Sequence, residues 1–328
     1  MAAFFMMIDI ALIYMGGTFG CVGDPLAPMS ADLFIPKLEQ LLATDQPLIQ
    51  YYCAPVIKDS SACTATDWLE LVQFIQNLQS EQQIQYFVII HGTDTLSYAS
   101  AVLAHFMGNS AHIVLTGSQY PLLNAEGDAQ REFSDAMDNL NFALDSVSQC
   151  EAGVYLAFHQ QLIHAQTALK QHTTELNAFT GLDAHIAIQA NQQSYQVTAD
   201  DIAKALDFNC MSLMMQPINL VQQFNNLKNI LAHPPHFLFL QGFGTGNLAV
   251  NPEIVDFINQ LYAKGCISVL TTQVPFGATD QRYAIAEWVH DCKILLNESY
   301  GHADLYAKAL KMYLQYDTVE QWHAHWYD

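Results

Sequence analysis

The chain has 328 residues, of which 51% are hydrophobic and 13% charged, so it can bury a large core and does not resemble a disordered chain. Eleven lysines and arginines against 32 aspartates and glutamates give a net charge of −21. A surface this negative repels phosphate backbones and anionic lipid headgroups, which argues against nucleic acid and membranes as partners. The length favours two domains over one.

The N-terminus is apolar, but it predicts a buried strand and not a signal peptide. No Lys or Arg precedes the apolar run, and Asp9 lies in its middle. No later stretch reaches the ~18 uncharged apolar residues that a membrane-spanning helix needs. Seven scattered cysteines without a C-x-x-C pair favour neither a disulfide framework nor a zinc knuckle. We therefore expect a reducing compartment, the cytoplasm.

Short β-rich runs alternate with longer stretches of helical periodicity along the chain. This alternation is typical of βαβ units and predicts an α/β fold with a mainly parallel sheet. The predicted strands are Ile8–Met15, Ile49–Ala54, Tyr86–His91, His112–Thr116, Gly153–Phe158, His236–Gln241, Cys266–Thr271 and Cys292–Leu296. The predicted helices are Ala31–Ala43, Thr66–Gln79, Thr95–Met107, Ala129–Ser146, Asn251–Lys264 and Ala303–Tyr316.

The alternation lapses between Gln189 and Pro235, where a polar run and an Ala-His-Pro-Pro bend occur. We therefore expect a larger N-terminal α/β catalytic domain at residues 1–190, a linker region at 191–235 and a smaller C-terminal α/β domain at 236–328. Near the C-terminus, His323 and His325 could bind a stray metal, but no accompanying ligand spacing supports this. A solvated terminal helix is the preferred interpretation, and we predict no metal site.

Two predicted strands end in glycine-rich loops, and one of them resembles a dinucleotide-binding fingerprint. In Gly242-Phe-Gly244-Thr-Gly246-Asn247, the third glycine of G-x-G-x-x-G would fall at Asn247. The next strand also lacks the Asp or Glu that holds a ribose. A nicotinamide site is therefore disfavoured, and no organic cofactor is expected.

The other glycine-rich loop belongs to a larger group of polar strand ends. Hydroxyls, a lysine and carboxylates follow four successive predicted strands, in Gly16-Gly17-Thr18, Lys58-Asp59-Ser60-Ser61, His91-Gly-Thr93-Asp94-Thr95 and Thr116-Gly-Ser-Gln119. Ligands bind past the carboxyl ends of strands in open α/β sheets. Some of these residues can simply cap helices, as we expect of Thr64 and Thr95, but caps do not require a glycine at each turn. The group favours a site for a small polar ligand.

These residues carry a resemblance to the bacterial-type L-asparaginases, closest to their cytoplasmic, type I form. Met15-Gly-Gly-Thr18 is similar to the T-G-G-T-I signature of that family, and His91-Gly-Thr-Asp-Thr95 matches its second signature completely. Ser134-Asp-Ala-x-x-Asn139-Leu and Thr167-x-x-Lys170 are similar to further family segments. The resemblance is dense through residue 180 and thin beyond residue 235.

The resemblance implies a two-domain asparaginase-like fold and hydrolysis of L-asparagine to L-aspartate and ammonia without metal or organic cofactor. By motif, Thr18 would attack the amide carbon, while Thr93, Lys170 and Asp94 would move protons. Ser60 would bind the substrate α-carboxylate with help from Ser61, and Asp94 would bind the α-amino group. It also implies a homodimer or homotetramer.

One departure from the family pattern bears on turnover. The family usually has a Tyr in the loop about a dozen residues after the nucleophile, but residues 19–29 contain none, and Leu26 takes that position. Gly20–Asp24 is flexible enough for a lid. The missing Tyr keeps open the alternative of a catalytically weak asparagine-binding sensor. Hydrolysis of glutamine or another small amide is a second alternative, because a pocket discriminates one methylene only weakly.

Overall fold

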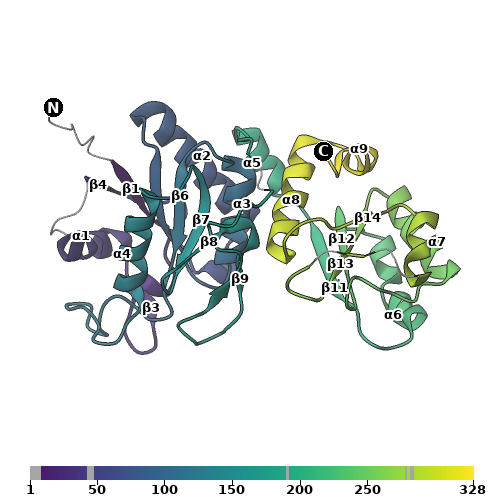
Figure 1. The fold of residues 1–328 in the computed structure, drawn as a ribbon, viewed down its shortest axis with the longest axis horizontal. Helices are drawn as coiled ribbons and strands as arrows, with labels where there is room; N and C mark the ends of the chain where they lie inside the picture. The colour runs from purple at the N-terminus through teal and green to yellow at the C-terminus, as the bar shows by residue number, and fades with distance from the viewer. Residues whose placement is uncertain (1–8, 43–47, 190–191, 278, 281–283) are drawn as a thin grey trace. The chain divides into compact units, whose positions relative to one another are not determined.

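The computed structural model describes residues 9–42, 48–189, 192–277, 279–280 and 284–328, and the chain divides into two compact units (Figure 1). The first unit comprises residues 1–203 and the second residues 204–328. The ends of two predicted elements, Ile8 and Ala43, lie outside the described residues. Among the described helices, none is both long and apolar enough to cross a membrane.

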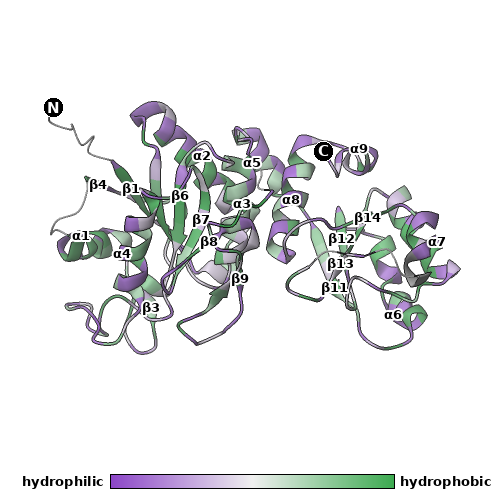
Figure 2. Ribbon diagram, viewed as in Figure 1, coloured by the Kyte–Doolittle hydropathy of each residue, from purple (hydrophilic) through white to green (hydrophobic). Residues whose placement is uncertain are grey.

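The first unit is built on a six-stranded sheet in the order β4-β1-β5-β6-β7-β8, in which only β8 runs antiparallel to its neighbour. Its strands are β1 (Ile10–Tyr14), β4 (Ile49–Cys53), β5 (Tyr86–Ile90), β6 (His112–Thr116), β7 (Gly153–Phe158) and β8 (Gln161–His164). The sheet is covered on both faces, so β1 and β5 read as continuous apolar runs (Figure 2). This is why their positions could be predicted within two residues.

Four helices flank this sheet (Figure 1): α1 (Ala31–Leu42), α2 (Ala65–Gln82), α3 (Leu96–Met107) and α4 (Ala136–Val147). Helices α1 and α4 share one core cluster with β1 and β5, through residues such as Phe34 and Leu140. Helices α2 and α3 pack against each other on the opposite face. Short two-stranded pairs, β2–β3 (Cys21–Val22 and Ala27–Pro28) and β9–β10 (Leu169–Lys170 and Phe179–Thr180), complete the unit.

The prediction of a helix from Ala129 was wrong, because α4 begins at Ala136. The backbone N–H of Arg131 instead donates to the carbonyl of Leu122, which holds residues 129–135 in a loop. The Asp135 carboxylate then accepts hydrogen bonds from two backbone N–H groups of the loop after β6. The spacing of apolar residues in the sequence gives no information on such side-chain-to-backbone hydrogen bonds, which compete with helix formation.

The second unit has a four-stranded parallel sheet in the order β11-β12-β13-β14. Its strands are β11 (Cys210–Met214), β12 (Phe237–Gly242), β13 (Ile267–Thr272) and β14 (Ile294–Leu296), and its helices include α6 (Leu220–Asn226), α7 (Pro252–Ala263), α8 (His302–Gln315) and α9 (Val319–His325). Helix α5 (Ala199–Ala205) spans the boundary between the units.

The structure places the boundary between residues 203 and 204, whereas the expected linker region extended from 191 to 235. Residues 204–235 contain β11 and α6 and belong to the second unit. Strand β11 lies at a sheet edge and exposes three of its five side chains, so its sequence lacks the apolar run of a central strand. The expected linker residues from 204 onward are thus part of a packed domain.

Candidate active site

The candidate site is assembled where three neighbouring parallel strands end. Strand β1 lies between β4 and β5, so the loops that follow these strands emerge at one edge of the sheet. The loop after β1 carries Thr18, the loop after β4 carries Ser60 and Ser61, and the loop after β5 carries Thr93 and Asp94. The structure thus brings together three strand ends that the sequence singled out.

Glycines let two of these loops touch through their backbones. Gly17 has a φ of +85°, and a Cβ placed there would lie 2.3 Å from the Cα of Gly92. A Cβ on Gly92 would lie 2.5 Å from the hydroxyl oxygen of Ser60. No larger residue fits either position without moving the chain. Thr18 and Thr93, which directly follow these two glycines, are therefore carried on tightly packed loops.

Lys170 reaches this edge from a distant part of the chain. It lies on β9, which pairs with β10 through Phe179. The Lys170 Nζ donates a hydrogen bond of 2.9 Å to Thr93 Oγ1 and lies 3.2 Å from Asp94 Oδ1. Thr93 is buried, whereas the Asp94 side chain is 60% exposed. Thr93, Asp94 and Lys170 form one hydrogen-bonded group that is open to solvent on the Asp94 side.

The remaining predicted residues differ in how they are held. Thr18 opens a 3-10 turn (Thr18–Gly20) and is partly buried, and among the described residues none hydrogen-bonds its hydroxyl. Ser60 is buried, and its carbonyl accepts a 2.7 Å hydrogen bond from the Thr95 hydroxyl. Ser61 is exposed and donates its hydroxyl to Asp59, which lowers the pKa of that carboxyl. Thr18 thus keeps its hydroxyl available, while Ser61 uses its own locally.

The two threonines expected to cap helices have different roles. Thr64 is the N-cap of α2, and its N–H donates to the Asp67 carboxylate at 2.6 Å. Thr95 occupies the N-cap position of α3 but makes no side-chain cap bond, because its hydroxyl donates to Ser60. Thr95 therefore links the loop after β5 to the loop after β4.

His91 is built into the end of β5 and cannot act as an acid or base at neutral pH. Its Nδ1–H donates to the carbonyl of Gly92 at 2.8 Å, and its Nε2 accepts from the Trp68 indole N–H at 3.2 Å. Full burial lowers the pKa of His91 to about 4. Both ring nitrogens are occupied and the ring is neutral, so His91 supports the strand end.

Asp135, at the N-cap position of α4, and Asn139, within α4, support the end of β6. The Asn139 side-chain amide donates to the carbonyl of Gly117 at 3.0 Å and to the Asp135 carboxylate. Both side chains are buried. Their i, i+4 spacing, which places two polar residues on one face of a helix, was the available signal.

The loop after Thr18 forms the β2–β3 hairpin. The hairpin contacts a neighbouring loop, where the N–H of Gly23 donates to the carbonyl of Ala125 at 3.0 Å. Leu26, which stands where the family pattern has Tyr, is 51% exposed. The hairpin therefore presents a hydrocarbon side chain and no phenol.

The second glycine-rich loop and the pair His323 and His325 belong to the second unit. Among the described residues, no group of three or more His, Cys, Asp or Glu side chains could hold a metal ion. In the second glycine-rich loop, a Cβ on Gly242 would lie 2.6 Å from the backbone of Gly246, so the loop packs on itself. His325 of α9 pairs with Asp328 at 2.6 Å.

Comparisons with known proteins agree with the motifs. The family described as "Asparaginase, N-terminal" matches residues 9–203. The L-asparaginase 1 of Escherichia coli K12 is 24% identical over 284 residues, covering 82% of this chain and 80% of that protein. The L-asparaginase of Thermococcus kodakarensis is 31% identical over 237 residues, covering 69% and 68%.

Solved structures share the fold over almost the whole chain. The thermostable L-asparaginase from Thermococcus kodakarensis superposes with a TM-score of 0.79 at 21% identity, covering 97% of this chain and 96% of that one. The L-asparaginase I from Vibrio cholerae gives a TM-score of 0.77 at 23% identity. The fold is that of a two-unit α/β protein of the asparaginase type. The chain belongs to the asparaginase family.

Other relatives are longer or have different names. The match to the L-asparaginase of Dirofilaria immitis spans 40% of that protein, and the match to a mouse 60 kDa lysophospholipase spans 41%. A relative from Nanoarchaeum equitans is named as part of a glutamyl-tRNA(Gln) amidotransferase. The family relationship alone therefore leaves the substrate open.

Proposed function

We propose that this chain is an amide hydrolase that converts L-asparagine to L-aspartate and ammonia, with Thr18 as the nucleophile. The observation that carries the proposal is the contact of Lys170 Nζ with Thr93 Oγ1 at 2.9 Å and Asp94 Oδ1 at 3.2 Å. Thr93 and Asp94 follow β5, which pairs with β1, the strand that precedes Thr18. A weak hydroxyl nucleophile needs such a proton-handling group within reach.

The proposed reaction proceeds through an acyl-enzyme. Thr18 Oγ1 attacks the side-chain amide carbon, its proton passes to the amide nitrogen, and ammonia leaves as an ester forms on Thr18. A water molecule activated by Thr93 and Lys170 then attacks the ester, releases L-aspartate and returns a proton to Thr18. Backbone N–H groups near Thr93 and in the Gly16–Thr18 turn would stabilise the oxyanion. His91 is excluded as the base, because its acceptor nitrogen Nε2 is occupied by the Trp68 indole N–H and burial lowers its pKa to about 4.

The substrate would be oriented by charge and hydrogen bonds. The exposed Asp94 carboxylate would bind the α-ammonium group, and Ser60, assisted by Ser61, would bind the α-carboxylate. Among the described residues, Lys170 is the only side chain that contacts the Asp94 carboxylate. That leaves its second oxygen available to a ligand. No metal or organic cofactor takes part in these steps.

Two alternatives to asparagine hydrolysis are glutamine hydrolysis and asparagine binding without turnover. Glutamine differs from asparagine by one methylene, which a pocket discriminates by only ~1–3 kcal/mol, so glutaminase activity is the nearest alternative. A catalytically weak asparagine sensor is favoured by Leu26, which cannot supply the phenol expected over Thr18. A sensor would bind asparagine and be stabilised by mass action without releasing ammonia.

The test measures ammonia release over hours beside thermal unfolding of the same sample with L-Asn or L-Gln. We expect ammonia from L-Asn with wild type and none with Thr18→Ala, while the melting temperature without ligand stays unchanged, because a turn hydroxyl contributes little to the core. Hydroxylamine should trap an aspartyl adduct in wild type only. A ligand-induced shift with no ammonia above blank would contradict the enzyme, and ammonia from Thr18→Ala would contradict the nucleophile.

We also propose a cytoplasmic location and a homodimer or homotetramer. The location is supported by the seven cysteines, all of which are unpaired in this chain. The oligomer rests on analogy with the family, because closed symmetric assemblies are common where a site is completed across an interface.

A further inference from the structure

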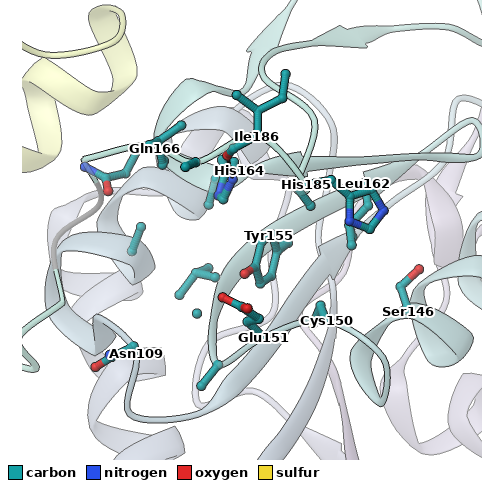
Figure 3. Close-up of a pocket in the computed structure, with 18 of the residues that line it drawn as sticks. Asn109, Ser146, Cys150, Glu151, Tyr155, Leu162, His164, Gln166, His185 and Ile186 are labelled. Carbon is teal, nitrogen blue, oxygen red and sulfur yellow. Dashed lines mark hydrogen bonds between the residues drawn. The ribbon is translucent and has the colours of Figure 1, made fainter.

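A separate cavity of about 770 Å³ lies in the first unit, away from the candidate active site (Figure 3). Its wall includes the first residues of β7, residues of β8, the C-terminal ends of α3 and α4 and the segment 184–188. The candidate active site follows the carboxyl ends of the strands, whereas this cavity lies at the amino end of β7. A strand of six residues spans ~20 Å, so the two sites lie at opposite ends of the strands.

Among the described lining residues, the side-chain carboxylate of the cavity has no Lys or Arg to balance its negative charge. Of the described residues that line it, none is Lys or Arg, while Glu151 contributes a carboxylate. Among the described residues no side chain pairs with Glu151, which is exposed and points toward the cavity (Figure 3). The chain's net charge of −21 adds to the negative potential. An anionic ligand such as a nucleotide would find no Lys or Arg side chain among the described lining residues.

Tyr155 supplies a second, independent feature of the cavity wall. Its side chain is 5% exposed, yet no described residue hydrogen-bonds its hydroxyl, which lies near Glu151 in Figure 3. Burial, with the charges of Cys150 and Glu151, raises the pKa of Tyr155 to about 12, so the phenol stays neutral. The ring is buried, but the hydroxyl oxygen keeps some accessible surface, so a ligand in the cavity could replace water as its hydrogen-bond partner.

An aromatic surface lies beside these polar groups. Tyr155 pairs across the strands with His164, and their ring centroids are 5.4 Å apart. His164 donates its Nε2–H to the carbonyl of Ile186 at 2.8 Å, which leaves Nδ1 as an acceptor in the neutral ring. Phe142 and Leu162 add apolar lining. A carboxylate, an acceptor nitrogen and aromatic rings together suit an ammonium group on a hydrocarbon body.

We propose that this cavity is a second binding site that takes an organic amine in its ammonium form, held by Glu151 and Tyr155. The ammonium would donate to the Glu151 carboxylate and to the Tyr155 hydroxyl oxygen, and the hydrocarbon part would pack against Phe142 and Leu162. The site is independent of the proposed asparagine hydrolysis, because none of its lining residues belongs to the candidate active site.

The experiment is calorimetric titration of the full chain with cadaverine, a five-carbon diamine, and with the uncharged diol of the same length. We expect cadaverine to bind with one-to-one stoichiometry and the diol to bind at least tenfold more weakly. Glu151→Gln should weaken cadaverine binding at least tenfold, and Tyr155→Phe severalfold. The matched control is Glu126→Gln, which removes the same charge from an exposed glutamate of another loop and should leave the affinity unchanged.

Three results would overturn the proposal. Wild type without saturable cadaverine binding would show that no amine site exists. Equal effects of Glu151→Gln and Glu126→Gln would mean that cadaverine responds only to net charge. Loss of cadaverine binding in Thr18→Ala would place the amine in the candidate active site. Because the readout is binding, it stays informative whether or not the chain hydrolyses asparagine.

Discussion

At the scale of single residues, the proposed chemistry depends on a lysine that touches both a buried hydroxyl and an exposed carboxylate. Lys170 donates to Thr93 and also contacts Asp94, so one ammonium group orients two side chains. The exposed carboxylate can then meet a charged substrate, while the buried hydroxyl is shielded from bulk water. The exposed Asp94 is therefore suited to bind substrate, and the buried Thr93 is suited to transfer protons with Lys170.

Asp94→Ala should reduce L-Asn binding about tenfold to a hundredfold, because a charge-assisted hydrogen bond to the substrate ammonium contributes ~1.5–3 kcal/mol and Lys170 would lose one of its two partners. Ser60→Ala should weaken binding by about tenfold or less, since a neutral hydrogen bond contributes ~0.5–1.5 kcal/mol. Calorimetry in a Thr18→Ala background measures both without turnover. Asp145→Ala, at an exposed position of α4, is the charge control. Unchanged affinity in Asp94→Ala would contradict the assignment.

His91 makes the free energy of unfolding depend on pH. Its pKa is lowered from 6.5 to about 4 in the folded state, so between these values the unfolded chain binds more protons and folding becomes less favourable as pH falls. The stability that His91 contributes is therefore fully present above pH 6.5 and is lost toward pH 4, by about 3 kcal/mol.

Urea unfolding at pH 7 and pH 5 should show a larger loss for wild type than for His91→Gln, whose amide cannot titrate. The difference between the two proteins isolates His91 from the carboxylates, which titrate in both. An equal pH dependence in wild type and His91→Gln would contradict the neutral, buried state of the imidazole.

At the scale of elements, the site depends on how closely the loop after β1 approaches the loop after β5. Gly17→Ala would place a methyl group 2.3 Å from the Cα of Gly92, and the backbone would have to move. We expect a loss of stability above ~3 kcal/mol and at least a ~10²-fold loss of activity, because small displacements of reacting groups are that costly.

The control is Gly265→Ala, where φ is +87° but nothing lies within 4 Å of the added methyl. That variant carries only the cost of a positive φ, ~1–2 kcal/mol, and should keep its activity. Thermal unfolding and ammonia release measure both effects. Equal losses in the two variants would mean that backbone conformation, and not contact between the loops, makes Gly17 necessary.

The β2–β3 hairpin limits turnover in the proposed mechanism, because it lacks a phenol. We expect slow hydrolysis in wild type, since one positioned proton-transfer group typically contributes ~10²–10⁴-fold. Leu26→Tyr should raise kcat if the hairpin closes over Thr18. Leu33→Tyr, at an exposed leucine of α1, is the control and should leave kcat unchanged. No gain in Leu26→Tyr would mean that the hairpin does not bring position 26 to the substrate.

At the scale of the whole molecule, the candidate site lies entirely in the first unit. Thr18, Ser60, Thr93, Asp94 and Lys170 all fall within residues 1–203, the span that the asparaginase family matches from residue 9. The second unit has its own core around Leu240 and Ile258. The sequence pattern indicated two domains because each unit repeats the alternation of strands and helices.

The sequence by itself determined the elements whose signal is local. Strands β1, β5 and β6 are buried on both faces and read as apolar runs, and the glycines beside Thr18 and Thr93 marked the loops that approach one another. The order of motifs also identified the family. These features need only neighbouring residues, since periodicity and backbone freedom are set within a few positions.

Only the tertiary structure decided which distant side chains meet. Lys170 contacts Thr93 across 77 positions, and that contact depends on sheet order and on the β9–β10 pair, which no periodicity marks. The late start of α4 and the strand β11 were likewise decided by hydrogen bonds to other segments. A local sequence pattern predicts whether a residue is buried. It does not predict which distant residue that side chain contacts, because such contacts depend on how the strands pair and the loops pack.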